Sequence, residues 1–130
     1  MTYLQALGLT AERAVGTGVL SYLRGGKSKG ALLGMRADMD ALPVQEETGL
    51  PFASEVPGVM HACGHDSHLA MLLVAARVLT ELREELPVDI LFIFQPAEEE
   101  IRNSGAERMK DHPRVRRSDR QIGLHIWGDM

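Results

Sequence analysis

An almost uninterrupted apolar run, Val88–Phe94, sets the fold class of this chain. Asp89 is its only polar residue, and Gln95 and Pro96 follow it directly. A strand with one face in water would alternate apolar and polar residues, whereas a short apolar run indicates a strand that is covered on both faces. The run therefore predicts an α/β fold, in which a mixed, mostly parallel sheet carries helices on both faces.

The other segments are consistent with such a sheet. Alternating and β-branched residues predict strands over Gly16–Leu23 and Ala31–Arg36, and the short glycine-rich link between them favours an antiparallel hairpin. Another inner strand is expected over Gln121–Trp127. Helical structure is expected in three segments, Tyr3–Leu7, Ser67–Leu86 and Ser104–Asp111.

The long helix, Ser67–Leu86, is expected to be buried at its start. Apolar residues lie nearly all round its first half, and charged residues fill its second half. Asp66 or Ser67 would cap its N-terminus, and Pro87 would end it.

Length and charge exclude several classes of partner. The 130 residues suffice for one domain whose core needs neither a disulfide nor a structural metal. The 14 basic and 18 acidic residues give a net charge of −4, which argues against nucleic acid or an anionic membrane as the main partner. No apolar stretch approaches the roughly 20 residues of a membrane-spanning helix, and the first residues show neither the basic region nor the long apolar region that is typical of a secretion signal. We therefore expect a cytoplasmic protein in which Cys63 stays reduced.

Potential metal ligands gather near the apolar run. His61, Cys63 and His65 lie two positions apart just before the long helix, and Glu98 and Glu99 follow the inner strand. Thiolate, imidazole and carboxylate groups are the ligands of zinc-like divalent ions. A spare carboxylate beside them is the usual proton acceptor in such hydrolytic sites. This combination predicts a hydrolytic metal site.

The expected topology would bring these groups together. His125 lies near the end of the strand predicted after the glutamate pair. If the strands are parallel, their carboxyl ends meet at one edge of the sheet, which is where open α/β sheets bind ligands.

Each of these residues also has a plainer interpretation. A lone cysteine is usually a small buried hydrophobe, a run of glutamates a solvated loop, and a histidine in an apolar strand a core residue. Asp38 and Asp40 could cap a loop. The basic stretch from Arg108 to Arg120 alternates with acidic residues, lacks aromatic side chains for base stacking, and is expected to be a solvated loop. Three histidines, a cysteine and an aspartate within residues 61–68 are harder to explain in this way.

Five blocks of the sequence together resemble a known family. In order, they are Arg36–Pro43, His61–His68, Phe94–Glu99, Gly105–Glu107 and Gly123–Trp127. They resemble the zinc-peptidase-like catalytic domain of metal-dependent amidohydrolases of the aminoacylase, hippurate hydrolase and auxin-conjugate hydrolase kind. The resemblance extends over nearly the whole chain, from Tyr3 to Trp127.

The resemblance implies a site with two close divalent ions, which could be Mn²⁺, Zn²⁺, Co²⁺ or Ni²⁺. Glu98 would be the general base, which removes a proton from water and returns it to the leaving nitrogen. Asp40 would be a supporting acid behind the ligands. The implied reaction hydrolyses an amide bond in N-acyl amino acids or peptide-like conjugates. The implied metal ligands are Cys63, His65, Glu99 and His125.

The chain departs from the family pattern in three respects, the first of which is that it lacks the family's usual first helix. Family members continue past the Gly123–Trp127 block into a lid and dimerisation domain and then return with one more histidine ligand, whereas this chain stops at Met130. Glu100–Ser104 also replaces a typically glycine-rich turn. We therefore expect residues 1–130 to form a partial metallohydrolase catalytic domain without the lid. Two functions stay open at this point, which are an amidohydrolase for a small-molecule substrate and a truncated metal-binding domain without turnover. Either of them could form a homo-oligomer.

Overall fold

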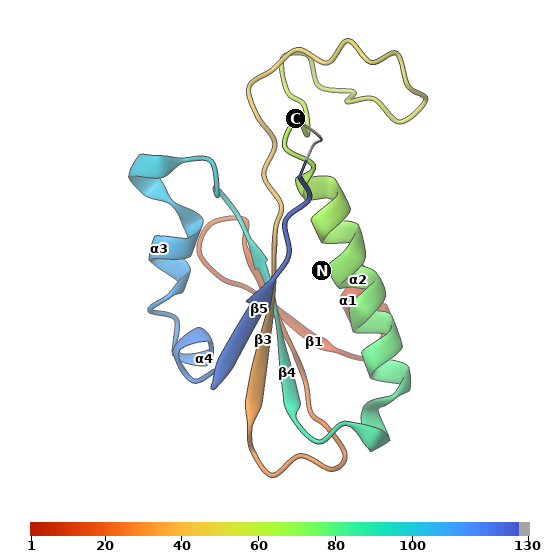
Figure 1. The fold of residues 1–130 in the computed structure, drawn as a ribbon, viewed down its shortest axis with the longest axis vertical. Helices are drawn as coiled ribbons and strands as arrows, with labels where there is room; N and C mark the ends of the chain where they lie inside the picture. Colours follow the sequence, from red (N-terminus) through yellow and green to blue (C-terminus); the bar gives the residue numbers. More distant parts are fainter. Residues whose placement is uncertain (128–130) are drawn as a thin grey trace.

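The computed structural model describes residues 1–127, which form a five-stranded mixed sheet with helices beside it (Figure 1). In spatial order the strands are β1 (Thr10–Arg13), β2 (Val19–Leu23), β4 (Asp89–Gln95), β3 (Leu32–Asp38) and β5 (Arg120–Gly123). Strand β2 pairs antiparallel with β1 and β4, whereas β3 pairs parallel with β4 and β5.

Helices cover both faces of the sheet (Figure 1). The α-helices of residues 1–127 are α1 (Thr2–Ala6), α2 (His65–Glu81), α3 (Gly105–Met109) and α4 (Pro113–Arg116). One face carries α1 and α2, and the other carries α3 and α4. Within the described residues, no helix combines the length and the apolar character needed to cross a membrane.

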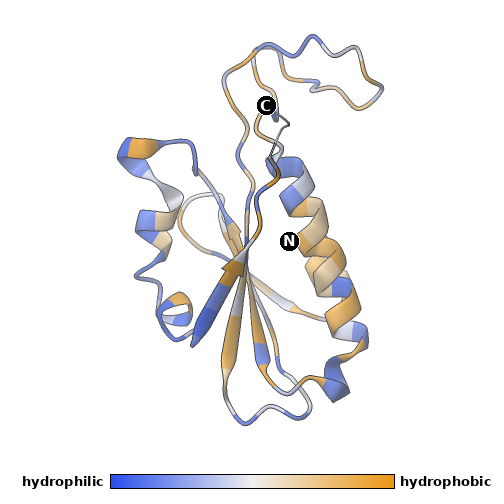
Figure 2. Cartoon of the chain, viewed as in Figure 1, coloured by the Kyte–Doolittle hydropathy of each residue, from blue (hydrophilic) through white to orange (hydrophobic). Residues whose placement is uncertain are grey.

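The central strand β4 supplies the core on both faces. All of its residues are buried, as the apolar run predicts. Because successive side chains of a strand point to opposite faces, Phe92 packs in the cluster under α2, and Leu91 packs in the cluster under α3 and α4. Figure 2 shows apolar residues concentrated along β3, β4 and the middle of α2. The predicted α/β fold with helices on both faces is confirmed.

The predicted hairpin between the second and third strands is wrong. Strand β4 lies between β2 and β3, so that Ile90 is the partner of both Leu23 and Leu33. The two flanking strands are therefore about 9–10 Å apart, which is twice the spacing of neighbouring strands. The glycine-rich link is long enough to span this distance, and the apolar β4 gains a paired neighbour on each side.

Helix α2 begins at His65, earlier than predicted, and neither Asp66 nor Ser67 caps it. Its N-cap is Gly64, whose φ of 75° lies in the left-handed region that favours glycine. A Cβ atom on Gly64 would lie 2.1 Å from Cδ1 of Ile126. Glycine at this position therefore starts the helix and admits the segment that follows β5.

Helix α2 ends at Glu81, before the predicted Leu86. A short 3-10 helix, η1 (Arg83–Glu85), follows it and brings the chain to Pro87. The first half of α2 is buried on one side only, because Leu72 contacts the core whereas Val74 is 60% exposed.

The inner strand predicted over Gln121–Trp127 is wrong in extent and position. Only Arg120–Gly123 form β5, which pairs with β3 and has no other partner strand among residues 1–127. All four residues of this edge strand are exposed. The residues after Gly123 leave the sheet and run toward the N-terminus of α2 (Figure 1).

The segment between β4 and β5 contains short helices. The helix predicted over Ser104–Asp111 is confirmed as α3, and a 3-10 helix, η2 (Ile101–Asn103), precedes it. The basic stretch was expected to be a solvated loop, and this is wrong at α4. Val115 of α4 is 7% exposed and packs against the sheet, while the arginines around it remain at the surface.

Candidate metal centre

The carboxyl ends of β3, β4 and β5 meet at one edge of the sheet because these three strands are parallel. The N-terminus of α2 reaches the same edge (Figure 1). The structure therefore brings the predicted site residues together, and they are Asp40 after β3, Glu98 and Glu99 after β4, His125 after β5, and Cys63 and His65 at the start of α2.

His65 lies at the centre of this cluster and is 1% exposed. Its Nδ1 atom lies 3.2 Å from Oδ1 of Asp40, so the imidazole donates its proton to this carboxylate. The other nitrogen, Nε2, is buried without a hydrogen-bond partner. It faces Oε2 of Glu98 and Oε1 of Glu99, each at 3.8 Å, which is too long for a hydrogen bond. A cation held between these atoms would satisfy all three.

Cys63 and His125 face each other on the exposed side of the cluster. The Sγ atom of Cys63 lies 3.6 Å from Nε2 of His125. A tetrahedral Zn²⁺ site with ordinary bond lengths places a sulfur and a nitrogen ligand about 3.5 Å apart. Nδ1 of His125 lies against the carbonyl oxygen of Ile126, which only accepts, so the lone pair of Nε2 points toward Cys63. Both histidines thus donate Nδ1–H to an oxygen, as metal-ligating histidines commonly do.

The surroundings favour charge on Asp40 and oppose it on Cys63. Burial raises the pKa of Asp40, but hydrogen bonds from the backbone N–H groups of Glu99 and Glu98 lower it by more than burial raises it, so the pKa lies below the usual value. The N–H of Glu99 donates to Oδ2 of Asp40 at 3.0 Å. A hydrogen bond to Glu99, burial and nearby carboxylates raise the pKa of the Cys63 thiol. A bound cation would reverse this effect, because it stabilises the thiolate.

Three groups of possible ligand atoms share His65, and within each group the atoms lie no more than 4.8 Å apart. One group combines it with Cys63 and His125, another with Glu98 and Glu99, and the third with the buried pair Asp38 and His68. Sulfur, nitrogen and carboxylate oxygen are the donor set of zinc-like ions. Together with the unpartnered Nε2 atom of His65, this geometry fits a divalent metal ion.

Two buried residues behind the site, Asp38 and His68, were not predicted from the sequence to be site residues. Nδ1 of His68 lies 2.6 Å from Oδ1 of Asp38, and Nη1 of Arg36 lies 2.8 Å from Oδ2 of Asp38. Asp38 therefore does not act as a simple loop cap. The sequence spacing does point to Asp38 and His68. His68 follows His65 by three positions and so lies on the same face of the helix, and Asp38 precedes Asp40 by two positions and so points to the same side of an extended chain.

His61 and Asp66 lie outside the cluster of ligand atoms. Both are exposed, and both line a separate hollow under the loop of residues 41–60. Some of the polar residues at positions 61–68 therefore face the ligand cluster, and the others face solvent.

Residues 34–130 match the peptidase family M20/M25/M40. The chain is 45% identical over 128 residues to an N-acyl-L-amino acid amidohydrolase of Geobacillus stearothermophilus, a match that covers 98% of this chain and 34% of that protein. It is 46% identical over 125 residues to thermostable carboxypeptidase 1 of Saccharolobus solfataricus, with coverage of 95% and 32%. The chain thus spans about a third of the length of the curated relatives it matches.

A solved structure shows the same fold. The YxeP protein of Bacillus subtilis, described as a dinuclear metal-binding peptidase from the M20 family, superposes with a TM-score of 0.90 at 38% sequence identity. The superposition covers 98% of this chain and 36% of that protein.

Proposed function

The chain belongs to the peptidase family M20/M25/M40, and we propose that its clustered ligands form part of the active site of an enzyme that hydrolyses amide bonds. The substrates would be N-acyl amino acids or peptide-like conjugates, since the similar proteins include an amidohydrolase and a carboxypeptidase. Residues 1–130 would be the metal-holding part of the catalytic domain.

One observation carries this proposal. The Nε2 atom of His65 is buried, has no hydrogen-bond partner, and faces the carboxylates of Glu98 and Glu99 at 3.8 Å. Buried polar atoms in folded proteins are almost always satisfied. A divalent ion explains both this unsatisfied nitrogen and the uncompensated carboxylates that face it.

The residues would divide the work as follows. Bound divalent ions would polarise the amide carbonyl and lower the pKa of water at the site. Glu98 is 38% exposed on its side chain, so it can reach a substrate, take a proton from water and pass it to the leaving nitrogen. Asp40 would hold the ring of His65 in place. The proposed metal ligands are Cys63, His65, Glu99 and His125.

The proposal extends to the ions and to the cellular compartment. The ions would be Mn²⁺, Zn²⁺, Co²⁺ or Ni²⁺, because imidazole suits Zn²⁺ and Ni²⁺, thiolate suits Zn²⁺, and carboxylate suits Mn²⁺. A reducing cytoplasm would keep Cys63 available as a ligand. A small molecule, and not a nucleic acid or a membrane, would be the partner of the site.

Matched substitutions at three neighbouring glutamates test the division of roles. Glu99→Gln should weaken Zn²⁺ binding sharply, because an amide replaces a charged ligand. Glu98→Gln should keep the affinity within about threefold and lower turnover of an N-acetyl amino acid by roughly 10² to 10⁴, as expected for loss of a general base. Glu100→Gln, at an exposed position, should change neither quantity. Calorimetric metal titration and an amide-hydrolysis assay give the two readouts.

Two results would contradict the proposal. If Glu98→Gln lost the metal and Glu99→Gln kept it, the two roles would be reversed. If Cys63→Ala and His65→Ala both retained the metal in folded samples, the ligand assignment itself would be wrong. Metal binding by the unmodified chain without turnover would favour a metal-binding domain that does not catalyse.

A further inference from the structure

We propose that His68 is a positioning residue, which together with Asp38 ties the segment after β5 to α2 and so sets His125 opposite Cys63. This inference rests on the proposed function, in which His125 is a metal ligand. His68 belongs to a group of possible ligand atoms with Asp38 and His65. Its contacts indicate a different role.

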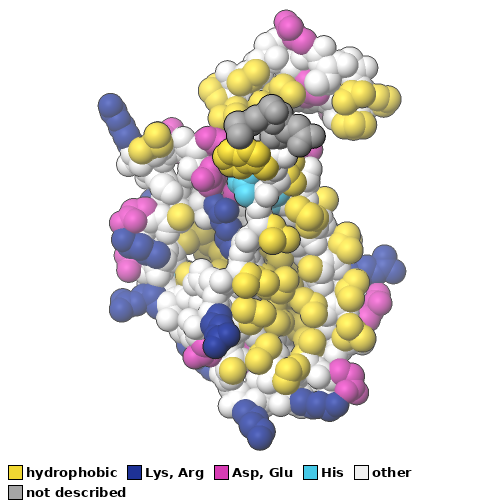
Figure 3. Space-filling model, viewed as in Figure 1, with side chains coloured by type: hydrophobic (Ala, Val, Ile, Leu, Met, Phe, Trp, Pro, Cys, Tyr) yellow, Lys and Arg dark blue, Asp and Glu magenta, His cyan; other side chains and the backbone are white. Residues whose placement is uncertain are grey.

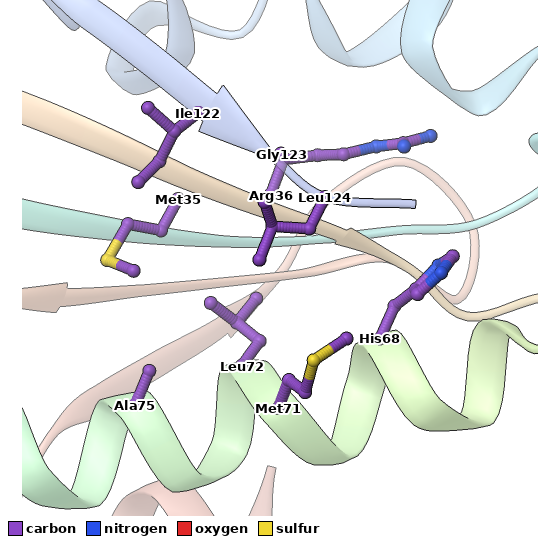
Figure 4. Close-up of a pocket in the computed structure, with 9 residues that line it drawn as sticks. All are labelled: Met35, Arg36, His68, Met71, Leu72, Ala75, Ile122, Gly123 and Leu124. Atoms are coloured by element: carbon purple, nitrogen blue, oxygen red, sulfur yellow. The ribbon is translucent and has the colours of Figure 1, made fainter. Parts of the chain in front are cut away.

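Both ring nitrogens of His68 are already used. Nδ1 lies 2.6 Å from Oδ1 of Asp38, and Nε2 lies 2.9 Å from the backbone nitrogen of Ile126. The side chain is 2% exposed, and Figure 4 shows it rising from α2 toward the strands. No ring nitrogen of His68 is therefore left for an ion.

These partners also determine where the proton of His68 lies. The backbone N–H of Ile126 can only donate, so Nε2 must accept. The proton is then on Nδ1 and is donated to the carboxylate of Asp38. Arg36 keeps this carboxylate in place through Nη1 at 2.8 Å, and Nε of Arg36 donates to Oε1 of Gln95 at 2.8 Å. The buried contacts thus extend from β4 through β3 to α2 and end on one backbone amide.

The amide that His68 holds is adjacent to the proposed ligand. Ile126 directly follows His125, whose own side chain is exposed and whose ring packs edge-on against His68 at a centroid distance of 4.7 Å. Ile126 also packs so closely on Gly64 that a Cβ atom there would lie 2.1 Å from its Cδ1. Two contacts on Ile126 therefore hold a segment that has already left the sheet.

The tether has a reason in the fold. Strand β5 is a four-residue edge strand whose partner among residues 1–127 is β3 alone, and its pairing ends at Gly123. An exposed segment of this kind would sample many conformations, and a ligand on it would have to be ordered when metal binds. The hydrogen bond from Ile126 to His68 removes much of that freedom beforehand.

The experiment compares His68→Leu, which removes the acceptor, with His68→Gln, which places a side-chain oxygen near the position of Nε2. His61→Leu is the matched control, because His61 is exposed and outside the ligand cluster. His68→Leu should lower the affinity for Zn²⁺ by roughly 10- to 100-fold, as outer residues that orient metal ligands do. It should also speed hydrogen exchange at the Ile126 amide by about tenfold, since one hydrogen bond is lost. His68→Gln should restore part of both, and His61→Leu should change neither.

Two further readouts keep the test decisive. Nitrogen NMR of the unmodified 130-residue chain should show His68 with its proton on Nδ1, and a proton on Nε2 would overturn the inference even if His68→Leu failed to fold. Unchanged zinc affinity and unchanged Ile126 exchange in a folded His68→Leu sample would overturn it as well. If the unmodified chain bound no Zn²⁺, the proposed function would fail, while the Ile126 exchange rates would still decide whether the tether exists.

Discussion

At the scale of single residues, Asp89 shows how this fold accommodates a charge at the start of its central strand. Asp89 is 5% exposed. The hydroxyl of Tyr22 donates to its Oδ2 at 2.5 Å, and the N–H of Gly25 donates to its Oδ1 at 3.0 Å. Burial raises the pKa of Asp89, but the hydrogen bonds from Tyr22, Gly25 and Ser28 together lower it by more than burial raises it, so the pKa lies below the usual 3.8. The folded state therefore favours the ionised carboxylate.

We predict that Asp89→Asn lowers the free energy of unfolding by about 1–3 kcal/mol at pH 7, because an amide offers one acceptor to two donors. Since folding depresses the pKa of Asp89, its stabilising contribution is complete above the unfolded value of 3.8 and is lost as the pH falls through the lower folded-state value. The gap between the two proteins should shrink in that acidic range. Urea unfolding at a series of pH values measures it.

Asp111→Asn serves as the control for this prediction. Asp111 is exposed, so its amide variant should unfold like the unmodified protein at neutral pH. A penalty for Asp89→Asn that stays constant from pH 7 to below the folded-state pKa would show that the charge of Asp89 does not matter.

At the scale of elements, the sequence predicted the interior better than the edges. The apolar run of β4 determines its own burial, so that strand was predictable within a residue. Position in the sheet is a different matter, because it depends on which strands compete for a partner. The hairpin prediction therefore failed when β4 took the place between β2 and β3, and the short, polar strand β1 had no apolar pattern to reveal it.

The same distinction applies to the site. The sequence predicted that Glu98 and His125 lie close together, because parallel strands place their carboxyl ends at one edge of the sheet. Cys63, just before the long helix, was predicted to reach the same edge. The pairing of His68 with the amide of Ile126 was not predictable, because it joins residues 58 positions apart through a backbone group that every residue has. Sequence patterns identify distinctive side chains, and they do not identify which backbone amide needs a partner.

The turn after β4 depends on a close contact between two elements. Gly105, the first residue of α3, lies so near β4 that a Cβ atom would be 1.7 Å from the carbonyl oxygen of Pro96. Its N–H donates to the carbonyl oxygen of Ala97 at 2.9 Å, and Ala97 itself has a φ of 51°. This φ is uncommon outside glycine and persists only where the surroundings enforce it. The contact at Gly105 thus fixes the turn that presents Glu98.

Gly105→Ala should destabilise the protein by at least about 2 kcal/mol, because the methyl group would have to displace backbone atoms. It should also weaken Zn²⁺ binding, since the glutamate turn would shift. Thermal unfolding and metal titration measure the two effects.

Gly123→Ala is the comparison for this substitution. A Cβ atom at Gly123 would lie 3.5 Å from Cδ of Arg36, which is an ordinary contact. Its stability should therefore change by less than about 0.5 kcal/mol, whereas equal stabilities of the two variants would refute the close contact at Gly105.

At the scale of the whole molecule, one face is unusually apolar. Figure 3 shows apolar side chains running along the side that α2 and β5 share. The exposed fractions are 60% for Val74, 46% for Val78, 49% for Ile122 and 70% for Leu124. Large exposed apolar patches usually mark contact surfaces.

We predict that the 130-residue chain self-associates through this face. Its mass in solution should exceed 14.3 kDa and rise with concentration in sedimentation or light-scattering measurements. Val74→Lys should shift the chain toward the monomer, because association would bury the new charge.

Phe52→Lys provides the control, because Phe52 is 79% exposed on the loop of residues 41–60 and not on the apolar face. It should leave the measured mass unchanged. A monomer at all concentrations, or equal effects of the two lysines, would contradict association through α2 and β5.

The place of β4 in the sheet also shapes how the chain reaches its native state. Strands β2 and β3 both emerge before β4 during synthesis, so the place between them stays empty until β4 arrives. The contact between Tyr22 and Asp89 likewise joins residues 67 positions apart. Closing such long loops precedes any gain from pairing, so folding is slow compared with that of a hairpin-built sheet. In the interval, the apolar edges of β2 and β3 are open to other nascent chains, and chaperones that shield unpaired strands would matter most at this stage.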